Sequence, residues 1–192
     1  SLLGEMAKNA TGQILDGDAA RAIVPHLRAD SAVKAFLDAD ASDIDTDRLH
    51  QSYIRHARKA GVRFLTDTPF LGAQFSHDAW TAHVGADQVR ARVIVCASGA
   101  WADQVAKSCG VAPVGLVPMR RTALLITPPD DWEIENWPLV MTASESVYFR
   151  PDAGKLMVSP ADETPDEPGD VQPDEWDVAV AAHRLQELLD IE

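Results

Sequence analysis

The sequence is short of cysteine and of long apolar runs, and each shortage excludes a class of protein. Cys96 and Cys109 are the two cysteines in 192 residues, and their spacing forms neither a disulfide framework nor a C-x-x-C pair. No apolar stretch reaches the length that crosses a bilayer, and no signal peptide opens the chain. We therefore expect a reduced cytoplasmic protein with no membrane partner.

Positive charge is scarce as well. The chain has 17 Lys and Arg against 30 Asp and Glu, a formal net charge of −13. Because no basic cluster is present to neutralise phosphates, nucleic acid is excluded as a main partner. Hydrophobic residues nonetheless make up 46% of the chain, enough for the core of one large domain or two small ones.

The spacing of apolar residues predicts helices and strands that alternate along the first part of the chain. A short helix is expected over residues 11–25, capped by Asp16 or Asp18, and a strand over residues 32–37. A second helix begins at Asp45 or Thr46 and ends before Gly61. The pattern then predicts strands over 62–66, 72–76, 80–84 and 92–95 and a helix over 100–109.

The last third of the chain has the pattern of an antiparallel sheet. Strands are expected over 124–127, 139–142, 147–150 and 156–159, with turn residues 151–154 joining the last two into a hairpin. Residues 161–175 combine Asp, Glu and Pro without a basic residue, which predicts an exposed and mobile loop. A final helix begins near Pro173 and carries an apolar stripe that includes Leu185 and Leu189.

One stretch can bring the backbone close to a ligand. Residues 93–97 are apolar, as expected of a strand buried on both faces, and Ser98 and Gly99 lead directly into a helix. Small residues at such a turn allow close approach, and the helix offers free N–H groups. Spacing alone favours a plain turn, because a single glycine is a weak signal.

Residues 93–101 resemble the segment "vvnaaGaWa" of the D-amino-acid oxidase superfamily, which includes glycine and sarcosine oxidases. Further segments resemble that family in the same order: 44–49 its "vdP..l", 61–64 its "Ga.i", 118–121 its "PvrGq", 148–156 its "vYlvPr.dGrl" and 159–163 its "Gat.e". Thr46 stands where proline is usual in the family, and Arg121 stands where glycine is common. The ordered set covers nearly the whole chain.

The resemblance implies an FAD-dependent oxidoreductase that oxidises the C–N bond of an amine or amino acid. FAD takes a hydride from the carbon next to the nitrogen, and the resulting imine hydrolyses; the protein supplies orientation and electrostatics. The residues implied on the cofactor side are Phe70, Ala97, Ser98, Gly99 and Trp101. No catalytic base is required, and the six histidines lack the spacing of a metal site.

Tyr148 and Arg150 are candidates for the substrate side. At a period of two they share one face of a strand, where a phenol and a guanidinium can hold a carboxylate. A solvated strand face explains the same pair. The resemblance implies that this sheet covers the flavin and that Tyr148 lines the substrate pocket. Arg120 is a third candidate, and an ion pair with one of the many carboxylates explains it equally well.

Two signatures of the family are absent from these 192 residues: the glycine-rich G-x-G-x-x-G loop and the closing segment "GlRp.tpD..p.iG". We therefore expect an internal segment that begins at Ser1 and whose partner is the rest of the parent polypeptide. The expected fold is α+β. Residues 1–43 hold a connecting helix and a substrate-domain strand, 44–112 part of an α/β FAD-binding domain, and 113–192 a mixed or antiparallel substrate-binding sheet with helices on one face.

Two other functions fit parts of the sequence. A serine hydrolase would use Ser98, but the run over residues 95–100 lacks the glycines that the G-x-S-x-G elbow requires. The second alternative is a non-catalytic α+β module that binds a partner, which would explain why the glycine-rich loop is absent. A G-x-G-x-x-G motif encoded upstream of Ser1 would decide for the enzyme.

We predict that the isolated chain purifies colourless and binds FAD at about millimolar affinity or worse, because a few hydrogen bonds of about 1 kcal/mol each do not offset the association entropy. The pyrophosphate of FAD requires a glycine-rich loop at a helix N-terminus, and a net charge of −13 opposes an anion. The absorbance spectrum of the purified chain measures bound flavin. Yellow protein with stoichiometric FAD would contradict the prediction.

Overall fold

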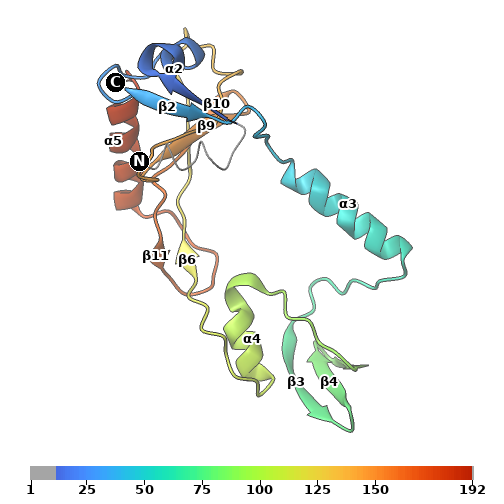
Figure 1. Ribbon diagram of the computed structural model, residues 1–192. Coiled ribbons are helices and arrows are strands. Elements are labelled where there is room, and N and C mark those ends of the chain that lie inside the picture. Colours follow the sequence, from blue (N-terminus) through green and yellow to red (C-terminus); the bar gives the residue numbers. More distant parts are fainter. Residues whose placement is uncertain (1–11, 192) are drawn as a thin grey trace. The chain divides into compact units, whose positions relative to one another are not determined.

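The computed structural model describes residues 12–191, which divide into two compact units (Figure 1). Within the described residues, the sheet unit comprises residues 12–41 and 119–191, and the meander unit comprises Ser42–Pro118. Helices and antiparallel strands occur in both units, so the α+β prediction is confirmed.

The sheet unit begins with a strand and a short helix. Strand β1 (Gln13–Asp16) pairs antiparallel with β2 (Lys34–Leu37), and helix α2 (Gly17–Ile23) lies between them in the sequence. The single helix expected over residues 11–25 is therefore wrong in its first half, and residue 11 lies outside the described residues. Pairing with a distant strand outweighs the local helix preference up to Asp16, whose side chain then caps α2 by accepting from the Ala19 amide at 2.8 Å.

Four strands form the main sheet of this unit. They are β7 (Leu124–Ile126), β8 (Val140–Met141), β9 (Tyr148–Asp152) and β10 (Lys155–Ser159), in the order β7-β10-β9-β8 and antiparallel throughout. The predicted hairpin is confirmed: Lys155 lies opposite Asp152, so Ala153 and Gly154 make a two-residue turn, both with positive φ (49° and 78°). The strand expected over residues 32–37 forms as β2 but lies outside the main sheet, because β2 pairs with β1.

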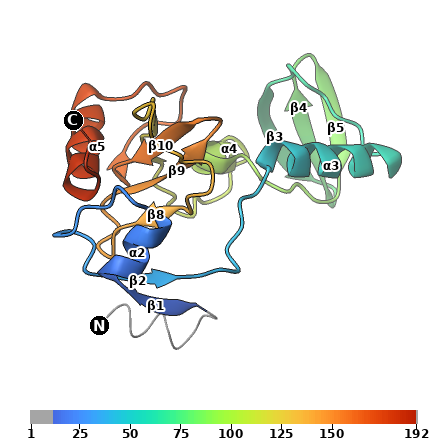
Figure 2. The same ribbon diagram turned by 90° about the horizontal axis from the view of Figure 1, so that it is seen from above.

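One face of the main sheet carries the core and the helices. Phe149 of β9 lies opposite Val158 of β10, Leu156 lies two residues before Val158 on the same face, and all three are fully buried. Helix α5 (Glu175–Leu188), capped by Asp174, adds Leu185 and its neighbours to this cluster, and α2 adds its own apolar side (Figure 2). Helices on one face of an antiparallel sheet were predicted, and the core confirms them.

The meander unit consists of one long helix, three strands and a short helix. Helix α3 (Thr46–Lys59) is capped by Asp45, and Gly61 follows its end with φ +85°. Strands β3 (Phe70–Ser76), β4 (Ala79–Val84) and β5 (Asp87–Ala91) form an antiparallel meander. The turn η1 (Gly99–Trp101) leads into α4 (Ala102–Ser108), and the carbonyl oxygen of Ser108 lies 2.7 Å from where a Cβ on Gly72 would stand.

Two predicted strands of the meander unit are absent. Residues 62–66 and 92–95 have no strand hydrogen bonds, and β5, which was not predicted, ends just before the second of them. Val93 and Val95 are 71% and 83% exposed, contrary to the expectation of burial on both faces. A strand requires a neighbour, and no described strand lies beside these segments.

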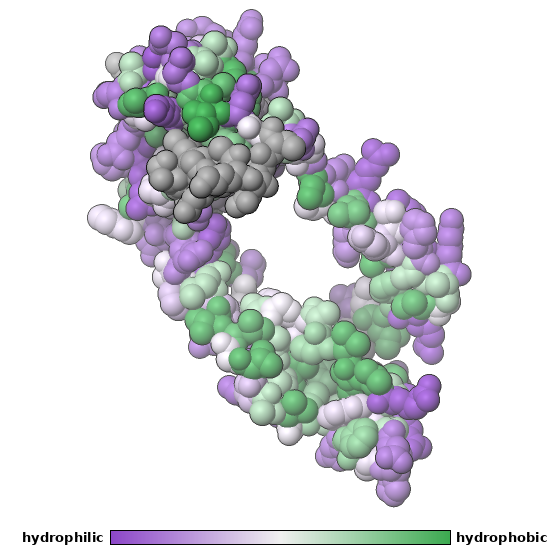
Figure 3. Space-filling model, in the orientation of Figure 1, coloured by the Kyte–Doolittle hydropathy of each residue, from purple (hydrophilic) through white to green (hydrophobic). Residues whose placement is uncertain are grey.

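Apolar residues are prominent on the surface where Figure 1 draws α4, β3 and β4 (Figure 3).

We predict that Leu185→Ala lowers the free energy of unfolding by about 2–5 kcal/mol, because a large buried side chain is lost from a packed core. Leu185 is 2% exposed and belongs to the cluster that joins α5 to the sheet. Urea denaturation followed by circular dichroism measures the change. Gln186→Ala, at the exposed neighbouring position, is the control, and equal unfolding midpoints for both variants would contradict the prediction.

Candidate functional site

The turn over residues 97–101 presents open backbone. Ala97 and Gly99 are exposed, and a Cβ added to Gly99 would meet no atom within 4 Å. The amides of Ala97, Ser98 and Gly99 have no acceptor within residues 12–191. Gly99 has φ +55°, a conformation that glycine adopts without strain, and Trp101 exposes its side chain. The turn therefore has room for a ligand and offers it backbone N–H donors.

Ser98 does not have the surroundings of a nucleophile. Its hydroxyl lies 3.2 Å from the Sγ of Cys96, and within the described chain no histidine or carboxylate is hydrogen-bonded to it. A serine hydrolase needs a base at that position. The geometry therefore gives no support to Ser98 as a catalytic residue.

Phe70, the other residue expected on the cofactor side, opens β3. It is half-buried and lies opposite Val84, and the carbonyl oxygen of the preceding Pro69 accepts from the Gly85 amide at 2.9 Å. Phe70 and the turn over residues 97–101 both belong to the meander unit. The structure thus keeps the cofactor-side candidates within one unit.

Charge is distributed unequally between the two units. The meander unit contains eight Lys and Arg and seven Asp and Glu, a net charge of +1, so the remaining residues carry −14. The net charge of −13 on the whole chain therefore does not describe the electrostatic field around the turn over residues 97–101. The prediction that this charge opposes FAD binding is corrected in that respect. The glycine-rich loop on which the family holds the pyrophosphate of FAD is still missing from these 192 residues.

Tyr148 and Arg150 lie on the face of the main sheet opposite to the core. Tyr148 faces Met141 and Ser159 across the neighbouring strands, and Arg150 faces Met157, whereas Phe149 between them points into the core. The two side chains thus share one sheet face, as their spacing predicts. The guanidinium of Arg150 is not free, because it approaches Asp152 at 3.5 Å and makes further contacts.

Arg120 is engaged by carboxylates rather than presented to a ligand. Its Nη1 and Nη2 donate to Asp166 at 3.1 Å and to Asp177 at 2.9 Å, and Arg120 and Asp177 are only 17% and 15% exposed. The hydrogen bond that Arg120 donates to Asp177 raises the pKa of the guanidinium above its ordinary value. The Nε is buried without an acceptor in residues 12–191. Of the two explanations of Arg120, this geometry favours the ion pair.

Arg121 and Thr122, which follow Arg120, also bind the acidic segment, the loop over residues 161–175. Arg121 pairs with Glu163 at 2.8 Å, and Asp162 accepts from both the amide and the hydroxyl of the buried Thr122 at 2.7 and 3.0 Å. The backbone adds a short ladder between β6 (Met119–Arg120) and β11 (Thr164–Pro165). The loop over residues 161–175 is mostly exposed as predicted, but its first half is held by these contacts.

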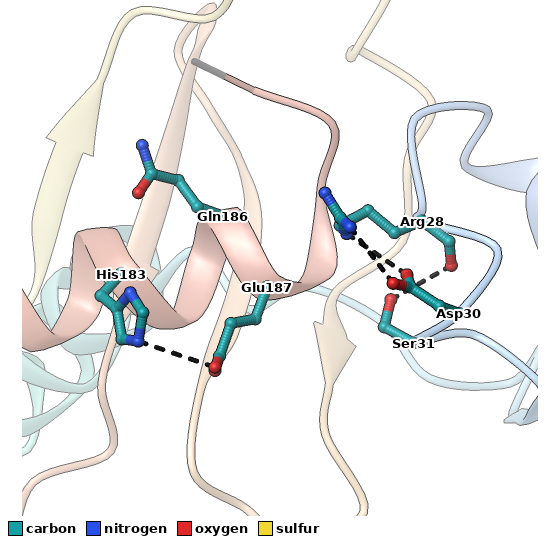
Figure 4. Close-up of a pocket in the computed structure, with 6 residues that line it drawn as sticks. All are labelled: Arg28, Asp30, Ser31, His183, Gln186 and Glu187. Carbon is teal, nitrogen blue, oxygen red and sulfur yellow. Dashed lines mark hydrogen bonds and ion pairs between the residues drawn. The ribbon is translucent and has the colours of Figure 1, made fainter.

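A shallow hollow of about 550 Å³ lies between residues 28–31 and α5 (Figure 4). Its charged groups pair with one another: Arg28 donates to both oxygens of Asp30 at 3.1 and 3.2 Å, and His183 lies 3.6 Å from Glu187. The hydrogen bonds from Arg28 lower the pKa of Asp30. None of the candidate residues lines the hollow.

Within residues 12–191, no cluster of side chains could hold a metal ion, and no helix is long and apolar enough to cross a membrane.

The family model described as "FAD dependent oxidoreductase" (DAO) matches residues 2–191. The chain belongs to the DAO family. This family is FAD-dependent, which confirms the resemblance and the type of cofactor. The match covers both units, so the sheet and meander units are two parts of one family architecture.

Solved structures agree with the DAO assignment at the level of fold. L-proline dehydrogenase from P. horikoshii matches with a TM-score of 0.79 and 16% identity over 97% of this chain and 50% of its own. Glycine oxidase from Geobacillus kaustophilus matches with 0.76 and 19% over 96% and 48%, and iminodiacetate oxidase from Chelativorans sp. BNC1 with 0.69 and 18% over 99% and 52%. The chain spans about half the length of these structures.

We predict that Asp177→Asn lowers the free energy of unfolding by about 1–3 kcal/mol, because a mostly buried charge-assisted hydrogen bond is lost. Glu163→Gln is the matched control: its ion pair with Arg121 is exposed, and such pairs contribute about 0–1 kcal/mol. Urea denaturation of both variants measures the difference. A loss for Glu163→Gln as large as that for Asp177→Asn would show that burial does not set the strength of this network.

Proposed function

We propose that this chain is part of a flavoenzyme that oxidises the C–N bond of an amine or amino acid to an imine by hydride transfer to FAD. The observation that carries the proposal is the open, uncharged backbone at residues 97–99 in a chain of an FAD-dependent family. The bound flavin supplies the electron-accepting chemistry, and the protein supplies position and electrostatics. The names of the similar structures, which act on proline, glycine and iminodiacetate, fit a small amine or amino-acid substrate.

Within this proposal the two units have different roles. In the meander unit, the backbone of residues 97–99 with Trp101 and Phe70 holds the uncharged part of FAD. In the sheet unit, the sheet face that carries Tyr148 and Arg150 binds substrate, with the Tyr148 hydroxyl donating to a carboxylate and Arg150 adding positive charge. Arg120, which binds Asp166 and Asp177, holds the acidic segment in place instead of contacting substrate.

The rest of the polypeptide is the partner that the proposal requires. Residues 62–66 and 93–97 would become strands by pairing with segments outside these 192 residues, which also supply the pyrophosphate site. The domain boundaries near residues 43 and 112 stay part of the proposal, and the two compact units divide at residues 41–42 and 118–119. Both cysteines are free thiols, in keeping with a reducing cytoplasm.

The test is the absorbance spectrum of the longer polypeptide encoded at this locus, followed by reduction of its flavin with glycine, sarcosine, D-amino acids, proline and iminodiacetate. Bound FAD that is bleached by one of these amines supports the proposal. A longer polypeptide that binds no flavin supports the alternative of a non-catalytic binding module.

We predict that Tyr148→Phe in the longer polypeptide lowers kcat/KM by the equivalent of one lost hydrogen bond, about 0.5–1.5 kcal/mol. Steady-state kinetics with the best amine measures the effect. The control is Tyr53→Phe, which removes the hydroxyl of the other tyrosine, on the exposed surface of α3. Unchanged kinetics for Tyr148→Phe would remove this residue from the substrate side.

A further inference from the structure

The side chain of Asp103 gathers three consecutive backbone amides. Its Oδ1 accepts from Val114 at 3.1 Å, and its Oδ2 accepts from Gly115 and Leu116, both at 3.0 Å. Successive amides that converge in this way form a concave anion site, and here a carboxylate of the same chain occupies it. Gly115 has φ +85°, the left-handed conformation that turns its amide toward the others.

These hydrogen bonds fold the chain back along α4. After α4 ends at Ser108, the amides of Gly110 and Val111 donate to the carbonyl oxygens of Lys107 and Ala106 and close the helix. The helix is about 10 Å long at 1.5 Å per residue, a length that residues 110–114 can retrace in extended form. Asp103 lies in the first turn of α4, so it fixes residues 114–116 at the N-terminal end of the helix.

The same end of α4 carries the turn over residues 97–101. η1 ends at Trp101, and α4 begins at the next residue. Val114, Leu116 and Val117 are exposed, so this stretch has little apolar burial of its own to hold it in place. Without Asp103, three amides would lose their acceptor at once, and the segment beside the turn would be free to move.

We infer that Asp103 is a positioning residue, which holds residues 114–116 against the end of α4 that presents the cofactor-side turn. The inference rests on the proposed function, because it takes the turn over residues 97–101 to contact FAD. Asp103 acts through the backbone and not by touching FAD. The sequence alone does not reveal this role, since an aspartate in the first turn of a helix is already explained by the helix dipole.

The experiment compares Asp103→Asn and Asp103→Ala with the wild type in the longer polypeptide, and Gln104→Ala, at the exposed neighbouring position, is the control. Asparagine has the shape of aspartate but one side-chain oxygen in place of two, so it can accept hydrogen bonds from fewer of the three amides. Hydrogen exchange reports on the amides of residues 114–116, titration of the apoprotein gives the FAD dissociation constant, and turnover at saturating FAD gives kcat.

The expected result is faster exchange at residues 114–116 in both variants and an FAD dissociation constant raised about tenfold in Asp103→Ala, less in Asp103→Asn, with kcat at saturating FAD changed far less. If Asp103→Ala does not fold, Asp103→Asn alone decides. Unchanged exchange, or faster exchange with unchanged FAD affinity, overturns the positioning role while leaving the proposed function intact. A wild type that binds no FAD overturns both.

Discussion

The antiparallel pairing of β9 with β10 decides what each face of the sheet unit can do. The two-residue turn at Ala153 and Gly154 sets the register, and the register places Phe149 and Leu156 on one face and Tyr148 and Arg150 on the other. The first face becomes a core, which α2, α5 and the buried loop residues Trp132, Ile134 and Trp137 cover. The second face carries Met141 and Met157 beside Tyr148 and Arg150, so it mixes apolar and polar side chains. A slip of one residue would exchange the two faces, burying a guanidinium and exposing a phenylalanine.

Sequence patterns predicted the elements that are specified locally. Asp45 and Gly61 delimit α3, the turn residues before Lys155 specify the hairpin, and the stripe through Leu185 specifies α5, because each signal lies within a few residues of its effect. The prediction was wrong where the decisive partner is distant. Residues 13–16 form a strand because β2 lies beside them, and the apolar run at 93–97 forms none because no described strand does.

The candidate site was predicted unevenly for the same reason. The common face of Tyr148 and Arg150 follows from a period of two, which a single strand reveals. The partners of Arg120 lie 46 and 57 residues away, so its engagement with Asp166 and Asp177 could not be foreseen from its own surroundings. The hydrogen bonds that Asp103 accepts from the amides of residues 114–116 have no sequence signature, because every residue type except proline has a backbone amide.

The unpaired apolar run at residues 93–97 has a consequence for the colloidal behaviour of the chain on its own. A β-branched segment with exposed backbone is a template for pairing with another copy of itself. The meander unit that carries the run has a net charge of only +1, so long-range repulsion between copies comes from the acidic sheet unit to which it is tethered. High salt screens that repulsion, and a pH near the sequence pI of about 4.7 removes most of the net charge, so both conditions favour self-association through this run.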